Sequence, residues 1–177
     1  MAVDTVIELV LLALVTAAAA VDLARRRIPN MLLLAGWAAA VPLHLMAPQP
    51  GPALLGALAG ALCGLLVFLP LYLLRGMAAG DVKMMATVGL FLGPSGTVYA
   101  CVMTWCVGGV MALTIIISKS RMRHAFANVM DLLRPLWMRA LGMPAATEPM
   151  RHASVGGMPY GLAIAAATMV LIFLRHH

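Results

Sequence analysis

The sequence predicts an all-α protein that crosses a membrane repeatedly, with six transmembrane helices of which the fourth is short. Hydrophobic residues make up 63% of the 177 residues and charged residues only 10%, and the mean hydropathy is +0.99. This composition leaves no room for a sizeable water-soluble domain, so we expect residues 1–177 to form a single integral membrane domain. The second observation is that apolar runs of helical length alternate with short breaks rich in Pro, Gly and Arg.

Six apolar runs define the expected helices. They are Thr5–Val21, Met31–Ala47, Ala53–Leu74, Val82–Leu92, Thr97–Ser118 and Met158–Leu174. The first run is predicted to be a retained helix. A signal peptide begins with basic residues, whereas the first region of this sequence carries Asp4 and Glu8 and no Lys or Arg. The fourth run spans about 16 Å, less than the ~30 Å bilayer core. We therefore expect a half-helix shielded by its neighbours, or one extended by a distorted turn through Gly93.

The distribution of Lys and Arg predicts the orientation. If the Arg25–Arg27 loop is cytoplasmic, alternating crossings place nearly every basic residue on that side. The N-terminus then lies outside, and residues 119–156 form a cytoplasmic amphipathic loop with a helix on the membrane surface or packed on other loops. The net charge of +6 does not indicate a nucleic-acid partner, because the basic residues are scattered and no aromatic and basic face accompanies them.

Two aspartates are the candidate catalytic residues. Asp22 and Asp81 each sit where an apolar run meets a basic flank, and the predicted topology puts both on the cytoplasmic side. Ionisable groups at membrane depth are costly and usually functional. A pair of carboxylates can hydrolyse a peptide bond when one activates water and the other, protonated, polarises the carbonyl. The pattern therefore favours an intramembrane aspartyl peptidase.

The residues around the pair suggest how it is held. Asp81 begins a helix beside Lys83, which favours the anion and the role of base, whereas Asp22 ends a helix and is the expected acid. Gly80 permits a close approach of the backbone and a positive φ. Pro29 ends the first helix, and Asn30 is expected to cap the second.

Other readings of the same residues remain open. Both aspartates could be interfacial residues paired with neighbouring basic side chains. A proton-coupled transporter or channel could use them as relay groups, although no internal repeat accompanies them. An inactive pilus-assembly scaffold is the third alternative. The cysteines and histidines show no metal-ligand spacing, so no metal or other cofactor is expected.

Three motifs resemble those of the type IV prepilin peptidases, especially the short Tad or Flp branch. The motifs are Asp22 with Arg27-Ile28-Pro29-Asn30, then Gly76-Met77-Ala78-Ala79-Gly80-Asp81-Val82-Lys83 followed by the Gly89…Gly93 run, and finally Pro159-Tyr160-Gly161. The resemblance implies a six-helix aspartyl peptidase of the bacterial inner membrane with Asp22 and Asp81 as catalytic residues. Such enzymes remove the short basic leader of a prepilin after a glycine, at the cytoplasmic border.

The resemblance also carries two qualifications. The usual Gly-x-Gly-Asp motif reads Ala78-Ala79-Gly80-Asp81 here, which changes the loop more than the chemistry. Longer members carry a cytoplasmic segment with four cysteines and methylate the new amino terminus, and this sequence shows no such cysteines. We therefore expect peptidase activity without methyltransferase activity. The expected partners are a prepilin or pseudopilin, membrane lipid and the pilus assembly machinery.

Overall fold

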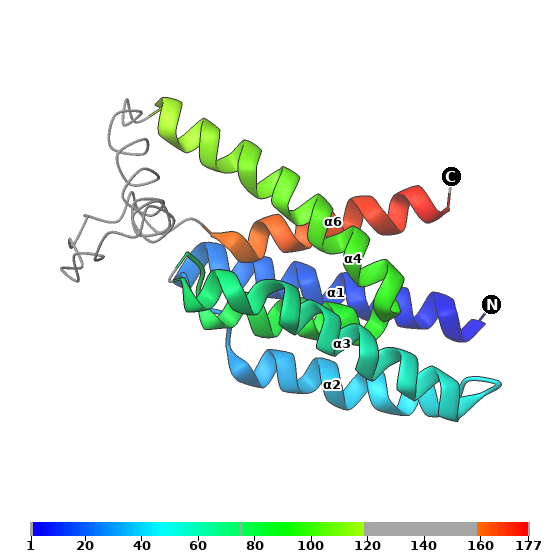
Figure 1. Ribbon diagram of the computed structural model, residues 1–177. Helices are drawn as coiled ribbons and strands as arrows, with labels where there is room; N and C mark the ends of the chain where they lie inside the picture. Colours follow the sequence, from blue (N-terminus) through cyan, green and yellow to red (C-terminus); the bar gives the residue numbers. More distant parts are fainter. Residues whose placement is uncertain (1, 75, 119–158, 177) are drawn as a thin grey trace, which may run out of the picture. The chain divides into compact units, whose positions relative to one another are not determined.

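The computed structural model describes residues 2–74, 76–118 and 159–176, all helices and their connections (Figure 1). The helices are α1 (Ala2–Arg25), α2 (Asn30–Leu45), α3 (Pro50–Leu73), α4 (Ala79–Ser118) and α6 (Tyr160–Arg175). The all-α class is therefore confirmed. The predicted cytoplasmic loop, residues 119–156, lies outside the described residues, and the single-domain assignment stays a prediction.

Among the described residues, three helices are long and apolar enough to cross a membrane. These are α1, α3 and α4, with candidate spans at Val3–Arg25, Pro50–Leu73 and Ala79–Ile115. The other two described helices, α2 and α6, are apolar but have 16 residues each. The protein is thus a membrane protein by length and composition of its helices, and the count of six spans stays a prediction.

Helix α4 contains the two predicted segments in one element with a kink between them. Gly93 has φ 70° and ψ 178°, which interrupts the helical geometry. Glycine tolerates this positive φ because it has no Cβ, and the following Pro94 cannot donate a backbone hydrogen bond. The distorted turn expected at Gly93 is therefore present.

A buried histidine supplies a hydrogen bond at this kink. Pro94 is four residues beyond Leu90, so the Leu90 carbonyl has no N–H to accept at the position where a regular helix provides one. His44, in the last turn of α2, has its Nε2 2.9 Å from that carbonyl oxygen. The ring nitrogen must carry the proton in this bond, because a carbonyl only accepts. His44 thus joins α2 to the end of the first segment of α4.

Helices α3 and α4 approach closely through small residues. A Cβ on Gly60 would collide with the Gly89 carbonyl, and a Cβ on Gly89 would collide with the Gly60 carbonyl. One turn further along α3, a Cβ on Gly64 would lie 2.6 Å from the Met85 carbonyl oxygen. Small residues commonly allow such contacts between membrane helices. They hold the first segment of α4 against α3.

Helix α1 packs against α2 and α6, with Leu11, Val15 and Ala18 wholly buried. α1 and α6 run antiparallel, and the N- and C-termini lie toward the same end in Figure 1. At that end, His176 Nε2 is 2.7 Å from Glu8 Oε2. At the other end of the two helices, the last turn of α1 lies beside the first turn of α6. Asp22 is in that last turn of α1.

We predict that Gly60→Ala destabilises the fold by about 1–3 kcal/mol, because its methyl group would force α3 away from α4. The matched control is Gly56→Ala, one turn earlier in α3, where a Cβ would meet nothing within 4 Å. That control should be neutral or stabilising by up to about 1 kcal/mol, since Ala is the better helix former. Thermal unfolding of the purified protein in detergent measures both changes, and equal stabilities would contradict the packing described.

We predict that His44→Ala lowers the free energy of unfolding by about 1–3 kcal/mol, because it leaves a buried carbonyl without a donor. His44→Gln, whose amide nitrogen can occupy a similar position, should lose less. The same unfolding assay compares the two variants. Equal losses would show that the hydrogen bond to Leu90 contributes nothing beyond the volume of the side chain.

Candidate active site

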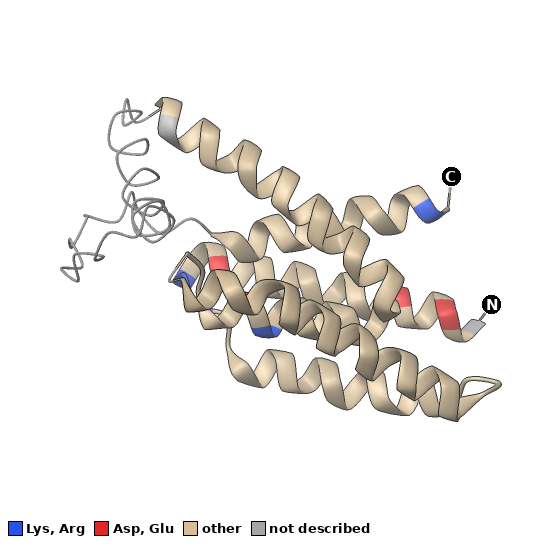
Figure 2. Ribbon diagram, viewed as in Figure 1, with Lys and Arg blue, Asp and Glu red and all other residues tan. Residues whose placement is uncertain are grey.

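Asp22 and Asp81 lie at the same end of the helical bundle. Asp22 is in the last turn of α1 and Asp81 is in the first turn of α4. Each residue is only 6% exposed, and the two carboxylates interact electrostatically. Figure 2 shows how few charged residues the described helices carry and that most lie toward helix ends. The prediction that these two aspartates could meet is consistent with this arrangement.

Asp22 is held through both its backbone and its side chain. Its backbone carbonyl accepts a hydrogen bond from the Arg26 N–H (2.8 Å), which closes the last turn of α1, and Arg26 then leaves the helix with φ 54°. Its Oδ2 accepts a hydrogen bond from the backbone N–H of Gly161 (3.0 Å). The Arg26 charge also acts on Asp22. The carboxylate therefore points from α1 toward the amino end of α6.

Asp81 is held by its own helix start. Its Oδ2 accepts a hydrogen bond from the Ala78 N–H (3.3 Å), and its backbone N–H donates to the Ala78 carbonyl (3.1 Å). This is the carboxylate half of a capping box, which satisfies a free N–H at a helix start. Ala78 contributes only backbone groups and is not among the described residues with positive φ. Alanine in place of the usual motif glycine therefore costs no backbone strain here.

The structure corrects two expectations about the flanking residues. Gly80 lies within α4 and does not use the positive φ that a glycine permits, and a Cβ there would sit an ordinary 3.5 Å from Ile28. Asn30 does not cap α2, because it is the first helical residue and Pro29 holds the cap position without a side-chain bond. Instead, the Asn30 Oδ1 accepts a hydrogen bond from Lys83 Nζ (3.2 Å). These residues join the starts of α2 and α4.

The third motif lies beside the aspartates. Pro159 is the cap residue of α6, followed by Tyr160 and Gly161. The Tyr160 ring packs edge-on against Phe68 with centroids 6.4 Å apart, and its hydroxyl lies against Gly108. Tyr160 also interacts electrostatically with Asp81. One turn of α6 therefore contacts Asp22 through Gly161 and faces Asp81 through Tyr160.

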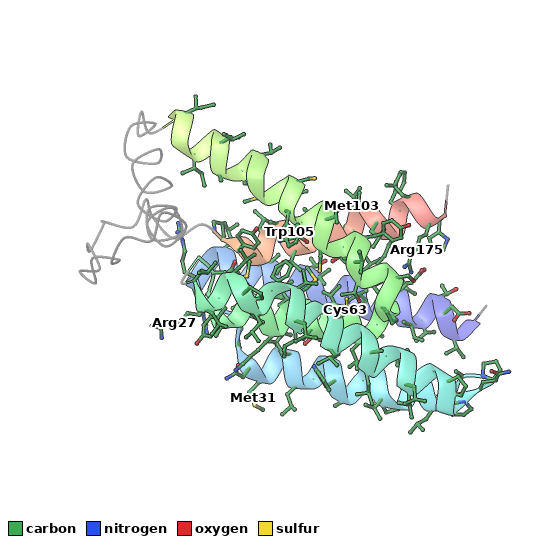
Figure 3. All side chains as sticks on the ribbon, in the orientation of Figure 1. Arg27, Met31, Cys63, Met103, Trp105 and Arg175 are labelled. Atoms are coloured by element: carbon green, nitrogen blue, oxygen red, sulfur yellow. The ribbon has the colours of Figure 1, made fainter. Side chains whose placement is uncertain are left out.

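Two predicted motif residues, Arg27 and Gly76, lie in connections between helices. Arg27 is exposed on the connection after α1, where Figure 3 labels it. Gly76 donates its backbone N–H to the Leu71 carbonyl (2.9 Å), which closes the end of α3. Phe68 and Gly108, which receive Tyr160, were not among the predicted site residues. An apolar residue and a glycine inside apolar runs carry no local signal for such a role.

The arrangement suits acid and base chemistry by two buried carboxylates. Neighbouring like charges favour a shared proton, which is the state that hydrolysis of an amide requires. Among the described residues, no group of three or more His, Cys, Asp or Glu could hold a metal ion.

The sequence profile of the type IV leader peptidase family matches residues 9–113, more than half of the 177 residues. The chain belongs to the type IV leader peptidase family. The match includes Asp22 and Asp81, whereas Pro159-Tyr160-Gly161 lies beyond it. Neither the curated proteins nor the solved structures that were compared gave a match.

Membership makes this leader peptidase a protease of the membrane whose substrates are prepilins in general. This result confirms the resemblance that the three motifs suggested. The family match does not extend to the catalytic roles of Asp22 and Asp81, the Flp branch or the cleavage site.

Proposed function

We propose that this leader peptidase is an intramembrane aspartyl endopeptidase that removes the short basic leader of Flp-type prepilins. Asp22 and Asp81 activate water for attack on the peptide bond that follows a glycine. The observation that supports this proposal is that two almost wholly buried carboxylates, from helices far apart in sequence, lie at one end of an apolar bundle and interact electrostatically. Burial of two acidic groups is costly, and ionisable residues at membrane depth are usually functional.

The proposed substrate matches the chemistry of this end of the bundle. A prepilin has a hydrophobic helix preceded by a basic leader, so its scissile bond lies where apolar and polar surroundings meet. Asp22 and Asp81 lie at the same kind of border, beside the basic Arg25–Arg27 segment and Lys83. The positive-inside rule puts this border on the cytoplasmic face of the bacterial inner membrane, with the N-terminus outside.

The two carboxylates divide the reaction between them. One, ionised, takes a proton from water as the water oxygen attacks the carbonyl carbon. The other, protonated, donates a hydrogen bond to the carbonyl oxygen and later a proton to the leaving amine. Because the membrane excludes water, the electrostatic interactions of the two carboxyl groups with the substrate are stronger there than in bulk water.

We predict that Asp22→Asn and Asp81→Asn each abolish cleavage of a Flp-type prepilin, because an amide keeps the shape of the carboxyl but cannot exchange its proton. The measurement is the mass of the new amino terminus after incubation with membranes that contain each variant at equal abundance. The same mass shows whether the product is methylated, and an unmethylated product is expected.

The matched control for these variants is Glu8→Gln, which makes the same chemical change at the opposite end of α1. Glu8 pairs with His176 and should be dispensable for cleavage. Normal cleavage by either aspartate variant would exclude the two-carboxylate mechanism. A wild-type protein that leaves a panel of prepilins and pseudopilins uncut would leave the relay or scaffold reading in its place.

The proposed orientation predicts which loops react with a membrane-impermeant thiol reagent. In a variant whose native cysteines are replaced, Arg27→Cys should be labelled only in inverted inner-membrane vesicles. Gln49→Cys, in the connection between α2 and α3, should be labelled only from the periplasmic side of spheroplasts. The opposite pattern would reverse the topology and separate the active site from the cytoplasm.

A further inference from the structure

We propose that Gly161 is a positioning residue for Asp22. Its backbone N–H orients the carboxylate, and its lack of a side chain provides the space that the carboxylate occupies. The inference rests on the proposed function of the aspartates, and it adds a residue from outside the part of the chain that the family profile matches.

The Gly161 N–H is directed at the Asp22 carboxylate. Gly161 is the second residue of α6, after the cap residue Pro159 and Tyr160. The first four N–H groups of a helix have no partner within it. In this protein one of them donates to Asp22 Oδ2 at 3.0 Å. The helix dipole adds an attraction for negative charge at the same end.

The space beside the Gly161 Cα is occupied by the Asp22 side chain. A Cβ on Gly161 would lie 2.8 Å from Asp22 Oδ2 and 3.1 Å from both its Cγ and its Cβ. All three atoms belong to a short, nearly buried side chain on a packed helix, so the clash cannot be relieved by swinging a flexible chain end away. Any side chain larger than hydrogen would therefore displace the carboxylate or separate α1 from α6.

Backbone conformation does not explain why a glycine occupies position 161. Among the described glycines only Gly93 has a positive φ, so Gly161 adopts a conformation open to every L residue. Gly56 and Gly109, in contrast, have nothing within 4 Å of an added Cβ. The requirement at position 161 is therefore for room beside Asp22.

The bond also assigns tasks to the two oxygens of Asp22. Because Oδ2 accepts the Gly161 N–H, which favours negative charge on that oxygen, we expect a proton on this carboxyl group to lie on Oδ1. Oδ1 is then the oxygen left for water or for the partner carboxyl. A displacement of about 1 Å at such a group can reduce a reaction rate about 100-fold.

The test is prepilin cleavage by purified Gly161→Ala in detergent or liposomes, with Gly56→Ala as the matched control. We expect kcat to fall at least about tenfold in Gly161→Ala with KM nearly unchanged, because the carboxylate moves while the substrate helix keeps its contacts. The pH profile of kcat should shift as well, whereas the control keeps the wild-type values. Rates are normalised to the folded fraction from thermal unfolding.

A wild-type kcat and pH profile for folded Gly161→Ala would overturn the proposal. An increase confined to KM would also overturn it, since that would place Gly161 in substrate binding. If the wild-type protein cuts no prepilin, the proposed function fails first, and the contact between Gly161 and Asp22 is still tested by the following experiment.

The second experiment depends neither on activity nor on the folding of a position-161 variant. The protein is labelled with ¹⁵N-glycine, and amide resonances are compared between wild type and Asp22→Asn. Replacement of the carboxyl acceptor by an amide should shift the Gly161 amide proton and leave those of Gly56 and Gly109 in place. An unshifted Gly161 resonance would overturn the proposed hydrogen bond.

Discussion

The hydrogen bonding of two buried carboxylates is the constraint on which the rest of this structure depends. A carboxylate buried in an apolar bundle loses the water that would stabilise its charge, and the loss is severe without polar partners. The protein provides backbone N–H groups at helix starts, Gly161 for Asp22 and Ala78 for Asp81. These donors have no partner within their own helices, so they serve the carboxylates without breaking helical hydrogen bonds.

This solution requires that three helix ends meet, and the remaining contacts maintain that meeting. Gly60 and Gly89 let α3 and α4 approach until their backbones touch. Trp37 Nε1 donates to Thr87 Oγ1 at 3.1 Å, and His44 reaches the Leu90 carbonyl, so α2 holds α4 at two levels. The packing of α1 against α6 then sets Asp22 beside Gly161. Small residues and a few polar contacts thus fix a site that hydrophobic packing alone would leave loosely defined.

The structure places the two predicted aspartates at one end of the bundle, and the residues that bond to them are not the ones that the sequence singled out for positioning them. Asp22 and Asp81 stand out because acidic residues are rare in apolar runs, and their shared side follows from counting helices. Gly80 was given the conformational role because it precedes Asp81, but it is an ordinary helical residue. The glycine that leaves room for the Asp22 carboxylate is Gly161, which is 139 residues away from Asp22 in the sequence. No local pattern indicates which glycine will contact a given carboxylate.

The sequence by itself determined that the chain is helical and membrane-embedded, that Gly93 is a candidate position for a distortion, and that Asp22 and Asp81 are the candidates for chemistry. Each of these follows from composition, periodicity or the intrinsic preference of Gly and Pro, which are properties of neighbouring residues. Only the tertiary structure decided that α6 supplies the donor to Asp22, that Asn30 contacts Lys83 and that His44 completes the kink in α4. Those contacts depend on the angle and depth at which distant helices pack, and side-chain volume across the whole bundle sets both.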